Sequence, residues 1–487
     1  MSGTTSHSSL ITSRAYIDGQ WCEAASGRTF EVTNPATGAV ITQVPDMNEE
    51  DTRRAIAAAH EAQPAWAALT AKERSNKLYA WFAAITAHSD ELARIMTCEQ
   101  GKPLAEAKGE VTYGASFIQW FAEEGKRAYG RTIPGFSGDR RLATIKQPVG
   151  VVAAITPWNF PIAMITRKAG PALAAGCTIV IKPAAETPLC ALALAVLAEQ
   201  AGIPAGVINI VTSHQPSAVG NELCNNPTVR KLSFTGSTRI GKLLMRQCAD
   251  TMKRLSLELG GNAPFIVFDD ADLDAAVAGA LASKYRNAGQ TCVCANRILV
   301  QASVYDAFAE KLTAAVAAFK VGDGMSEGTQ IGPLINPAAA SKVAELVQQS
   351  VAAGAEVLLG GEPHPAGPLF YRPTILGKVA RDNPILQEEI FGPVAPLVRF
   401  ESEAEAIALA NDTPYGLAAY FYGRDIARVW RVAEQLEYGM VGINEGIIST
   451  ELAPFGGIKE SGLGREGAAE GLEEYLETKY LCFGAIR

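Results

Sequence analysis

Cys292 is the residue in this sequence best suited to act as a nucleophile. It lies in residues 287–294, which read NAGQTCVC. A thiol becomes a strong nucleophile as the thiolate, which forms where nearby charge or backbone N–H groups lower the thiol pKa, commonly at a loop or a helix start. Gly289 and the two polar residues after it suit such an exposed turn. The alternative is that Cys292 is a small buried hydrophobic residue, as most lone cysteines are.

The segments around Cys292 alternate between strand-like and helical patterns. Before it we expect strands at 149–155, 178–182, 207–211 and 229–234, with helices at 162–175 and 189–200 and a further helix before residue 229. After residue 261 we expect strands at 263–268, 298–301, 356–359, 393–400, 417–422 and 440–444, and helices at 271–285, 305–319, 402–411 and 425–436. This alternation is typical of βαβ units in doubly wound open sheets, which bind ligands at the carboxyl ends of their strands.

The N-terminal part differs from this pattern. A hairpin is expected at 15–21, where an Asp-Gly pair favours a tight turn, and helical periodicity covers 49–88 and 90–125. Residues 127–146 form an irregular Gly/Arg stretch. Together with residues 473–483 this stretch suggests contacts between subunits, in a homodimer or a homotetramer.

Composition excludes several classes of protein. A chain of 487 residues is too long for a single core, so two or three domains are expected. Its net charge of −8 argues against nucleic acid and anionic membranes as partners. The nine scattered cysteines favour a reducing compartment, hence the cytoplasm, over a disulfide scaffold. There is no apolar run long enough to span a membrane, and the five histidines have no metal-binding or catalytic spacing.

Residues 234–241 close a predicted strand and open a helix. The backbone N–H groups of such a helix start can bind a pyrophosphate. The glycine spacing is not the usual G-x-G-x-x-G. The alternative, that Gly236 serves only a tight turn between the strand and the helix, therefore stays open.

Six motifs occur in the order found in the aldehyde dehydrogenase superfamily, and from about residue 14 the whole chain resembles this superfamily. The motifs are TPWNFP at 156–161, FTGS at 234–237, ELGG at 258–261, GQTC at 289–292, EIFGP at 389–393 and PFGG at 454–457. The resemblance implies an α/β fold with a Rossmann-like cofactor domain, a catalytic domain and a small oligomerisation arm. The division expected is a disordered tail at 1–13, a dinucleotide-binding domain at 14–126 and 147–261, a catalytic domain at 262–455, and an arm at 127–146 and 470–487.

The resemblance also implies a catalytic mechanism. Cys292 would attack an aldehyde, and the Asn159 amide with the Cys292 backbone N–H would hold the resulting oxyanion. Glu258 would activate the water that hydrolyses the thioester, a role that needs a carboxylate with a pKa near the working pH. The alternatives are a capping role for Asn159 and a structural ion pair for Glu258.

The cofactor implied by the resemblance is a nicotinamide dinucleotide. Its expected contacts are Pro157, Trp158, Lys182, Ala184, Ala185, Gly236, Ser237, Leu259, Glu389 and Phe391. Many NAD-preferring relatives carry a glutamate at the position of Ala185, where its charge repels a 2′-phosphate. Here the acid is displaced to Glu186, and Lys182 is near. We therefore predict NADP, with NAD as the alternative.

The expected substrate is a semialdehyde with a distal carboxylate. Residues 164–168, 285–287 and 444–449 look like the succinate-semialdehyde dehydrogenase branch, in which two arginines and a serine bind the carboxylate. The matching residues are Arg167, Arg286 and Ser449, and guanidinium groups suit a carboxylate ligand. The alternative is that both arginines are solvated helix residues.

Several alternatives stay open at this level. Glutarate semialdehyde is one methylene longer than succinate semialdehyde, and a pocket discriminates a methylene weakly. A non-catalytic structural protein on this fold is the alternative from another class, and a coenzyme A-acylating enzyme is a third. Cys294 is either a bystander or the partner of Cys292 in a strained regulatory disulfide.

Overall fold

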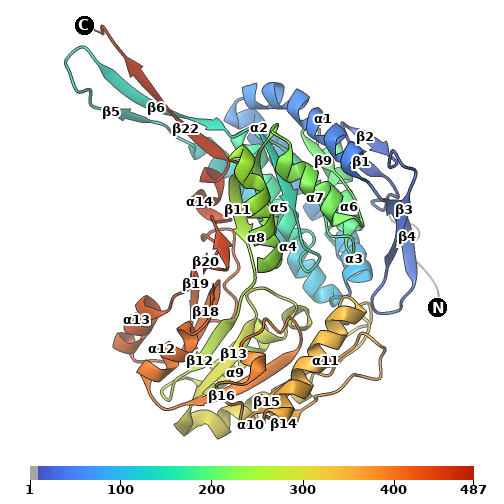
Figure 1. Ribbon diagram of the computed structural model, residues 1–487, viewed down its shortest axis with the longest axis vertical. Helices are drawn as coiled ribbons and strands as arrows, with labels where there is room; N and C mark the ends of the chain where they lie inside the picture. Colours follow the sequence, from blue (N-terminus) through green and yellow to red (C-terminus); the bar gives the residue numbers. More distant parts are fainter. Residues whose placement is uncertain (1–8, 487) are drawn as a thin grey trace.

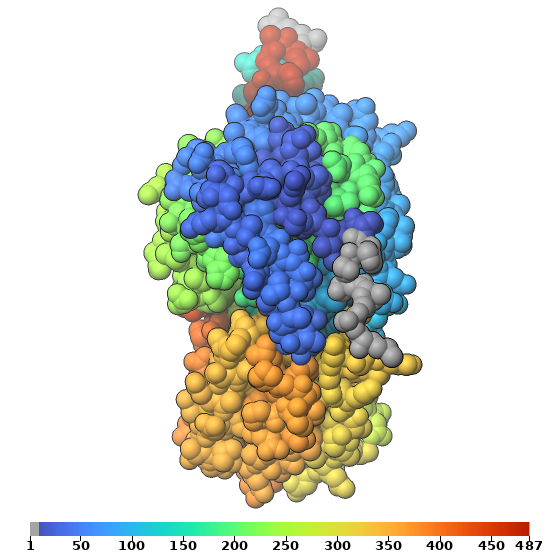
Figure 2. Space-filling view, turned by 90° about the vertical axis from the view of Figure 1, so that its right-hand side faces the viewer, coloured from blue at the N-terminus to red at the C-terminus, as the bar shows by residue number. Residues whose placement is uncertain are grey.

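The structure is a computed structural model that describes residues 9–486 of the chain. Figure 1 shows two sheet-based lobes, one above the other, and an arm that projects from the upper lobe. Figure 2 shows the same division from the side, with the N-terminal third of the chain in the upper part and residues from about 300 to 400 in the lower part. Residues 1–8 of the predicted tail lie outside the described residues. Leu10, in contrast, is buried against the N-terminal core.

The upper lobe is built on an eight-stranded sheet. Its parallel centre has the order β9-β8-β7-β10-β11. These strands are β7 (Val151–Ile155), β8 (Thr178–Lys182), β9 (Ile208–Ile210), β10 (Val229–Thr235) and β11 (Arg254–Glu258). The antiparallel edges are β1 (Ala15–Ile17), β2 (Gln20–Cys22) and β21 (Gly462–Leu463). Strands buried on both faces read as nearly continuous apolar runs, which explains why their positions were predictable.

The helices of this lobe are α1 (Glu49–Ala68), α2 (Ala71–Ala87), α3 (Ser89–Gln100), α4 (Leu104–Glu124), α5 (Ala163–Ala175), α6 (Pro188–Gln200), α7 (Pro216–Asn225) and α8 (Thr238–Cys248). Each long helical region predicted before residue 126 is therefore two helices. Thr70 caps α2 in a capping box with Glu73, which starts a new helix. Gly101, with φ 95°, ends α3 in the left-handed region.

The lower lobe contains a seven-stranded sheet with the order β14-β15-β16-β13-β12-β18-β19. Its strands are β12 (Ala263–Val267), β13 (Ala295–Gln301), β14 (Glu356–Leu359), β15 (Thr374–Gly377), β16 (Val394–Phe400), β18 (Ala418–Tyr422) and β19 (Met440–Ile443). Its helices are α9 (Leu273–Lys284), α10 (Tyr305–Ala317), α11 (Pro337–Ala352), α12 (Glu403–Asn411) and α13 (Ile426–Gln435). Only β14 runs antiparallel to its neighbour in this sheet. Both lobes combine a mainly parallel sheet with helices, so the α/β class predicted from the sequence is confirmed.

The arm is a three-stranded antiparallel sheet of β5 (Arg131–Ile133), β6 (Arg141–Pro148) and β22 (Leu476–Phe483), in the order β22-β6-β5 (Figure 1). The expectation that residues 127–146 are irregular was therefore wrong. The glycines lie around and between the strands, and pairing with the C-terminal β22 orders β6. Tyr129 and Phe136 are strongly exposed on the arm.

The remaining elements are small. A hairpin of β3 (Thr29–Thr33) and β4 (Val40–Pro45) lies near the N-terminus, and β17 (Tyr415–Gly416) pairs with β20 (Ile458–Lys459). The short helix α14 (Ala468–Glu473) packs on α4 and α5 and leads into β22. No helix in residues 9–486 is long and apolar enough to cross a membrane.

Candidate active site

A cavity of about 290 Å³ lies where residues from both lobes meet. It is lined by Cys292 and Asn159, by seven of the ten predicted cofactor contacts (Pro157, Trp158, Gly236, Ser237, Leu259, Glu389 and Phe391), and by Thr235, Gly260, Ala339, Lys342 and Ile390. Many of these residues follow the carboxyl ends of β7, β10 and β11, where doubly wound sheets bind ligands. The sequence therefore identified most of the lining, but not the contribution of α11 through Ala339 and Lys342.

The cavity has an aromatic wall and a polar edge. The Trp158 and Phe391 rings meet edge to face at 5.6 Å between centroids. The Glu389 carboxylate accepts a hydrogen bond of 3.1 Å from the backbone N–H of Gly261. Burial raises the pKa of Glu389 to about 7. Aromatic walls with a few oriented polar groups are typical of a small-molecule or cofactor site.

The turn between β10 and α8 forms another side of the cavity. Ser237 is the N-cap of α8, but no side chain caps the first turn of this helix within the described chain. Backbone N–H groups at such a helix start can bind a phosphate. A Cβ atom on Gly236 would lie 2.5 Å from the Phe234 ring, so glycine is needed there for space. The tight-turn interpretation of Gly236 is thus supported, and phosphate binding by this segment stays a prediction.

Lys182, Ala184 and Ala185, which were predicted to contact the cofactor, do not line this cavity. Lys182 is buried at the end of β8, and its Nζ donates to the carbonyl oxygen of Pro183 at 3.0 Å. Burial lowers the pKa of Lys182 to about 8, while Glu186 opposes this shift. Ala185 and Glu186 line a second cavity of about 340 Å³ beside the β3–β4 hairpin.

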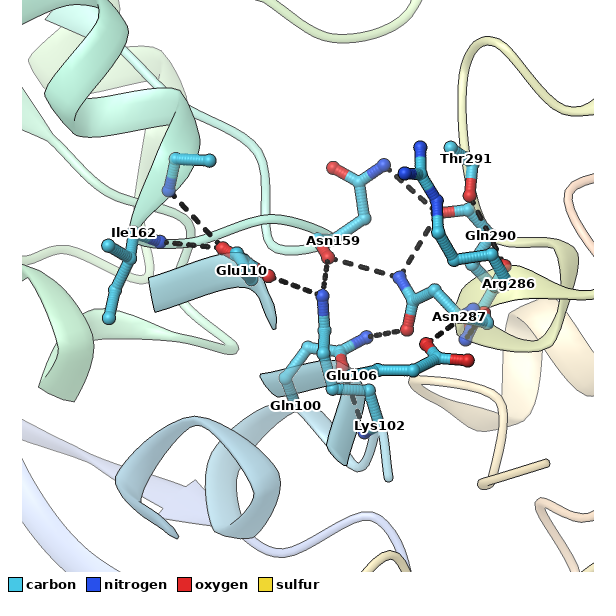
Figure 3. A network of polar contacts seen from close by, with 11 residues as sticks. Gln100, Lys102, Glu106, Glu110, Asn159, Ile162, Arg286, Asn287, Gln290 and Thr291 are labelled. Atoms are coloured by element: carbon cyan, nitrogen blue, oxygen red, sulfur yellow. Dashed lines mark hydrogen bonds and ion pairs between the residues drawn. The ribbon is translucent and has the colours of Figure 1, made fainter. Parts of the chain in front are cut away.

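The loop that carries Cys292 is buried and held by side chains. It begins with the short helix η3 (Arg286–Gly289), in which Asn287 and Ala288 have φ of 53° and 54°. The Asn287 amide donates to the carbonyl oxygens of Asn159 at 3.0 Å and Gln290 at 3.2 Å (Figure 3). It accepts a hydrogen bond of 3.0 Å from Gln100. The sequence suggested an exposed turn, and the structure corrects this.

Cys292 itself is half-buried at the cavity wall. Burial raises the pKa of its thiol to about 12, Glu389 adds to this shift, and Arg167 opposes it. The expected lowering of the thiol pKa is thus not found in the protein alone. A positive charge brought close to the sulfur would lower this pKa and favour the thiolate.

Asn159 lines the same cavity as Cys292. It is held at both ends by hydrogen bonds (Figure 3). Its backbone carbonyl accepts hydrogen bonds from Lys102 Nζ at 2.7 Å and from Asn287. Its side-chain Nδ2 donates to the Gln290 carbonyl at 3.0 Å, which uses one of two amide hydrogens. The second hydrogen is available to an oxyanion at the cavity.

Glu258 ends β11 and is buried. Neither of its carboxylate oxygens has a hydrogen-bond partner among residues 9–486. Burial raises the pKa of Glu258 well above its usual range, repulsion by Glu466 adds to the shift, and Arg167 and Lys168 oppose it. A carboxyl group with a raised pKa suits a general base that works near or above neutral pH.

A buried ionic cluster links this base to α5. Arg167 Nε lies 2.7 Å from Glu466 Oε2, and Lys168 Nζ contacts Glu466 Oε1 and the Thr235 hydroxyl. Arg167 is only 1% exposed, so it is not a solvated helix residue. Glu466 lies near the C-terminus, and no motif in the sequence marked it.

Arg167, Arg286 and Ser449 all act on the hydroxyl of Tyr113. The charges of both arginines and a contact with Ser449 affect this hydroxyl, and both arginine charges also reach the Cys292 thiol. The guanidinium of Arg167 stacks on the Phe455 ring at 4.0 Å, and that of Arg286 on Phe160 at 5.2 Å. The three predicted substrate residues thus act on one residue, Tyr113, which no motif in the sequence marked.

Cys294 is a buried free thiol, and Cys292 is also free. The Cys294 Sγ donates to the backbone carbonyl of Lys284 at 3.4 Å. The oxidative pairing of the two sulfurs therefore remains a prediction. Within residues 9–486, no group of three or more His, Cys, Asp or Glu side chains is arranged to hold a metal ion.

Comparison with known proteins agrees with this geometry. The family model described as "Aldehyde dehydrogenase family" matches residues 21–481. The chain is 63% identical over 477 residues to a glutarate-semialdehyde dehydrogenase from Pseudomonas aeruginosa, covering 98% of this chain and 99% of the relative. It is also 63% identical over 477 residues to an NADP-dependent succinate-semialdehyde dehydrogenase from Escherichia coli, with the same coverage.

A solved structure is similarly close. The crystal structure of a succinate-semialdehyde dehydrogenase from Burkholderia pseudomallei superposes with a TM-score of 0.98 at 59% identity, covering 99% of this chain and all of the other. The resemblance expected from the ordered motifs is therefore confirmed along nearly the whole chain. The chain belongs to the aldehyde dehydrogenase family.

Proposed function

We propose that this protein oxidises succinate semialdehyde to succinate with NADP. The observation that carries this proposal is that two features meet at Cys292. One is the cavity with the Asn159 amide and the Trp158–Phe391 wall, and the other is the group of Arg167, Arg286 and Ser449, whose two arginine charges act on the thiol. The first suits an aldehyde and a dinucleotide, and the second suits a distal carboxylate.

The proposed reaction begins when the Cys292 sulfur bonds to the aldehyde carbon. The carbonyl oxygen becomes an oxyanion, which accepts hydrogen bonds from Asn159 Nδ2 and the Cys292 backbone N–H. When bound, a nicotinamide dinucleotide would supply the acceptor for the hydride of this carbon. Glu258 then takes a proton from the water that attacks the thioester, which releases the acid and restores the thiol.

The residues present fit a dinucleotide. The start of α8, which Ser237 does not cap through its side chain, suits the pyrophosphate. Glu389 and Phe391 would hold the nicotinamide ribose. We propose NADP over NAD because Ala185 removes a carboxylate beside the 2′-phosphate, while Lys182 is near.

The test is the absorbance of the reduced dinucleotide with succinate semialdehyde, using wild type, Cys292→Ala and Cys294→Ala. We expect activity in the wild type, a loss of at least about 10³-fold in Cys292→Ala, and retention in Cys294→Ala. Cys294→Ala is the matched control because it removes a thiol two residues away. Equal activity of Cys292→Ala and wild type would refute the mechanism, and a requirement for coenzyme A would favour the acylating alternative.

Glutarate semialdehyde is the second candidate substrate, since a relative of that name is as similar as the succinate-semialdehyde relative. One methylene changes binding by about 1–3 kcal/mol, so we expect measurable activity with both. A series of semialdehydes from two to six carbons, assayed with both dinucleotides, ranks them. If the five-carbon substrate, glutarate semialdehyde, has the higher kcat/KM, it is the preferred substrate in place of succinate semialdehyde.

We further propose that the protein works as a homodimer or homotetramer in the cytoplasm. The projecting arm exposes Tyr129, Phe136 and Tyr480, which are aromatic groups suited to a subunit interface. The scattered free thiols fit a reducing compartment. Light scattering after size exclusion tests the assembly: the wild type should be oligomeric, and a monomer at working concentration would refute it.

A further inference from the structure

The hydroxyl of Tyr113 is a buried polar group that contacts Ser449 but makes no hydrogen bond of good geometry within the described residues. Tyr113 lies on α4, which packs against the helix that carries Arg167. Its hydroxyl oxygen is shielded from solvent and makes no hydrogen bond with correct geometry to any residue that the structure describes. A buried hydroxyl without a partner costs about 1–3 kcal/mol, so its presence in this site calls for an explanation.

Packing does not explain the hydroxyl. The Tyr113 ring meets Phe117 edge to face, with centroids 5.0 Å apart, and packs against the cluster of Phe160, Ala163 and Met164. A phenylalanine would make these same ring contacts without burying an oxygen. The oxygen is therefore the part of the residue that the protein alone does not use.

The groups around the hydroxyl point to an anionic ligand. Arg167 and Arg286 act on it from two different helical elements, and Ser449 contributes a second hydroxyl. Arg167 Nε forms an ion pair with Glu466 at 2.7 Å, and neither Nε nor Nη2 makes a hydrogen bond of good geometry within residues 9–486. Three donors are thus left partly or wholly free in one place: a guanidinium Nη2, a phenol and an alcohol.

Burial raises the pKa of Tyr113 in spite of both arginines, so the phenol stays protonated near neutral pH and can donate. A carboxylate has about four lone-pair sites for hydrogen bonds. Two guanidinium groups satisfy its charge, but their planar geometry leaves further sites open. A neutral donor completes this shell without adding another buried positive charge.

We propose that the Tyr113 hydroxyl donates a hydrogen bond to the distal carboxylate of the substrate and so contributes to substrate specificity. This inference rests on the proposed function, because it assigns a further residue to the carboxylate end of that substrate. It assigns Tyr113 no part in the chemistry at Cys292.

The test compares Tyr113→Phe with Thr112→Val, using succinate semialdehyde and butanal, the uncharged aldehyde of equal chain length. Thr112 is the adjacent exposed residue, and its hydroxyl only donates to the Lys108 carbonyl of the same helix. Loss of a hydrogen bond to a charged group is expected to raise KM for succinate semialdehyde about 10- to 100-fold in Tyr113→Phe. The kcat for both aldehydes, KM for butanal, and all constants of Thr112→Val should change less than about twofold.

A second measurement needs no turnover. Succinate should raise the thermal unfolding midpoint of the wild type and raise it much less in Tyr113→Phe. Without ligand, Tyr113→Phe should be at least as stable as the wild type, because it removes an unpaired buried hydroxyl. If Tyr113→Phe does not fold, Tyr113→Met supplies the same comparison.

The possible outcomes separate the two proposals. A wild type that does not prefer succinate semialdehyde to butanal would contradict the proposed function. A wild type with that preference and a Tyr113→Phe variant with unchanged KM and an unchanged response to succinate would overturn the role of Tyr113 alone. An equal loss on both aldehydes would also overturn it, because it would indicate a structural role.

Discussion

Arg167 Nε lies 2.7 Å from Glu466 Oε2 in the buried interior, so the guanidinium forms an ion pair with a protein carboxylate. Its Nη2 has no hydrogen-bond partner within the described chain. Glu466 also contacts Lys168 and raises the proton affinity of Glu258. One carboxylate thus connects a residue of the proposed carboxylate site with the proposed general base.

The arginine pair should decide the preference for a charged substrate. Arg286→Ala should raise KM for succinate semialdehyde about 100-fold, because an ionic hydrogen bond contributes about 1.5–3 kcal/mol, and should leave butanal nearly unchanged. Arg167→Ala should do the same, with an added loss of stability, because it leaves Glu466 with less compensation. Initial rates with both aldehydes measure this. Equal losses on the two substrates would contradict the role of the arginines.

Glu466 should be essential for stability. Glu466→Gln leaves Arg167 and Lys168 buried without a full counter-charge, which should cost about 3–5 kcal/mol in the free energy of unfolding. Urea unfolding measures this. Glu473→Gln is the matched control, since its partner Lys146 is on the arm and Glu473 is exposed; such surface pairs contribute about 0–1 kcal/mol. Similar losses in both variants would contradict the importance of the buried cluster.

Some parts of this fold could be predicted from the sequence because they depend on local patterns. Buried parallel strands are nearly continuous apolar runs, and the cavity residues that follow them belong to short motifs. The break between α1 and α2 also has a local signature, because Thr70 and Glu73 form a capping box at the start of α2.

Other parts depend on contacts between distant segments. The strands of the arm form because β22, at the far end of the chain, pairs with β6. Glu466 and Tyr113 enter the site through the packing of α4, α5 and the C-terminal segment, for which no local pattern exists. The raised thiol pKa of Cys292 likewise follows from burial by residues that the local sequence does not reveal.

The rate of thioester hydrolysis should rise with pH. Burial and Glu466 raise the pKa of Glu258 well above its usual range, so the carboxyl group gains its function as a base as the pH rises through this shifted pKa. Pre-steady-state hydrolysis of the acyl enzyme, followed across pH, measures this. Glu466→Gln removes the repulsion between Glu466 and Glu258 and leaves the charges of Arg167 and Lys168 in place. The rising part of the pH–rate profile should therefore move to lower pH. A pH-independent rate in the wild type would contradict Glu258 as the titrating base.

Oxidation should link Cys292 to Cys294. The two residues are separated by Val293 alone, so the bond would be strained and readily reduced. Treatment with peroxide should give a peptide that has lost two hydrogens, together with activity that dithiothreitol restores. In Cys294→Ser the same treatment should inactivate irreversibly, because Cys292 has no resolving thiol. Mass spectrometry without a 292–294 link would end this hypothesis.

The cofactor preference should depend on position 185. In the wild type, Ala185 brings no charge to the cavity that it lines together with Glu186. Ala185→Glu restores the carboxylate that repels a phosphate and binds ribose hydroxyls, so kcat/KM with NADP should fall at least about 10-fold while that with NAD holds or rises. Ala185→Gln is the matched control, because it has the same size without the charge and should change the ratio much less. If both variants keep the wild-type ratio, the 2′-phosphate does not lie beside this residue, and the preference must come from another part of the site.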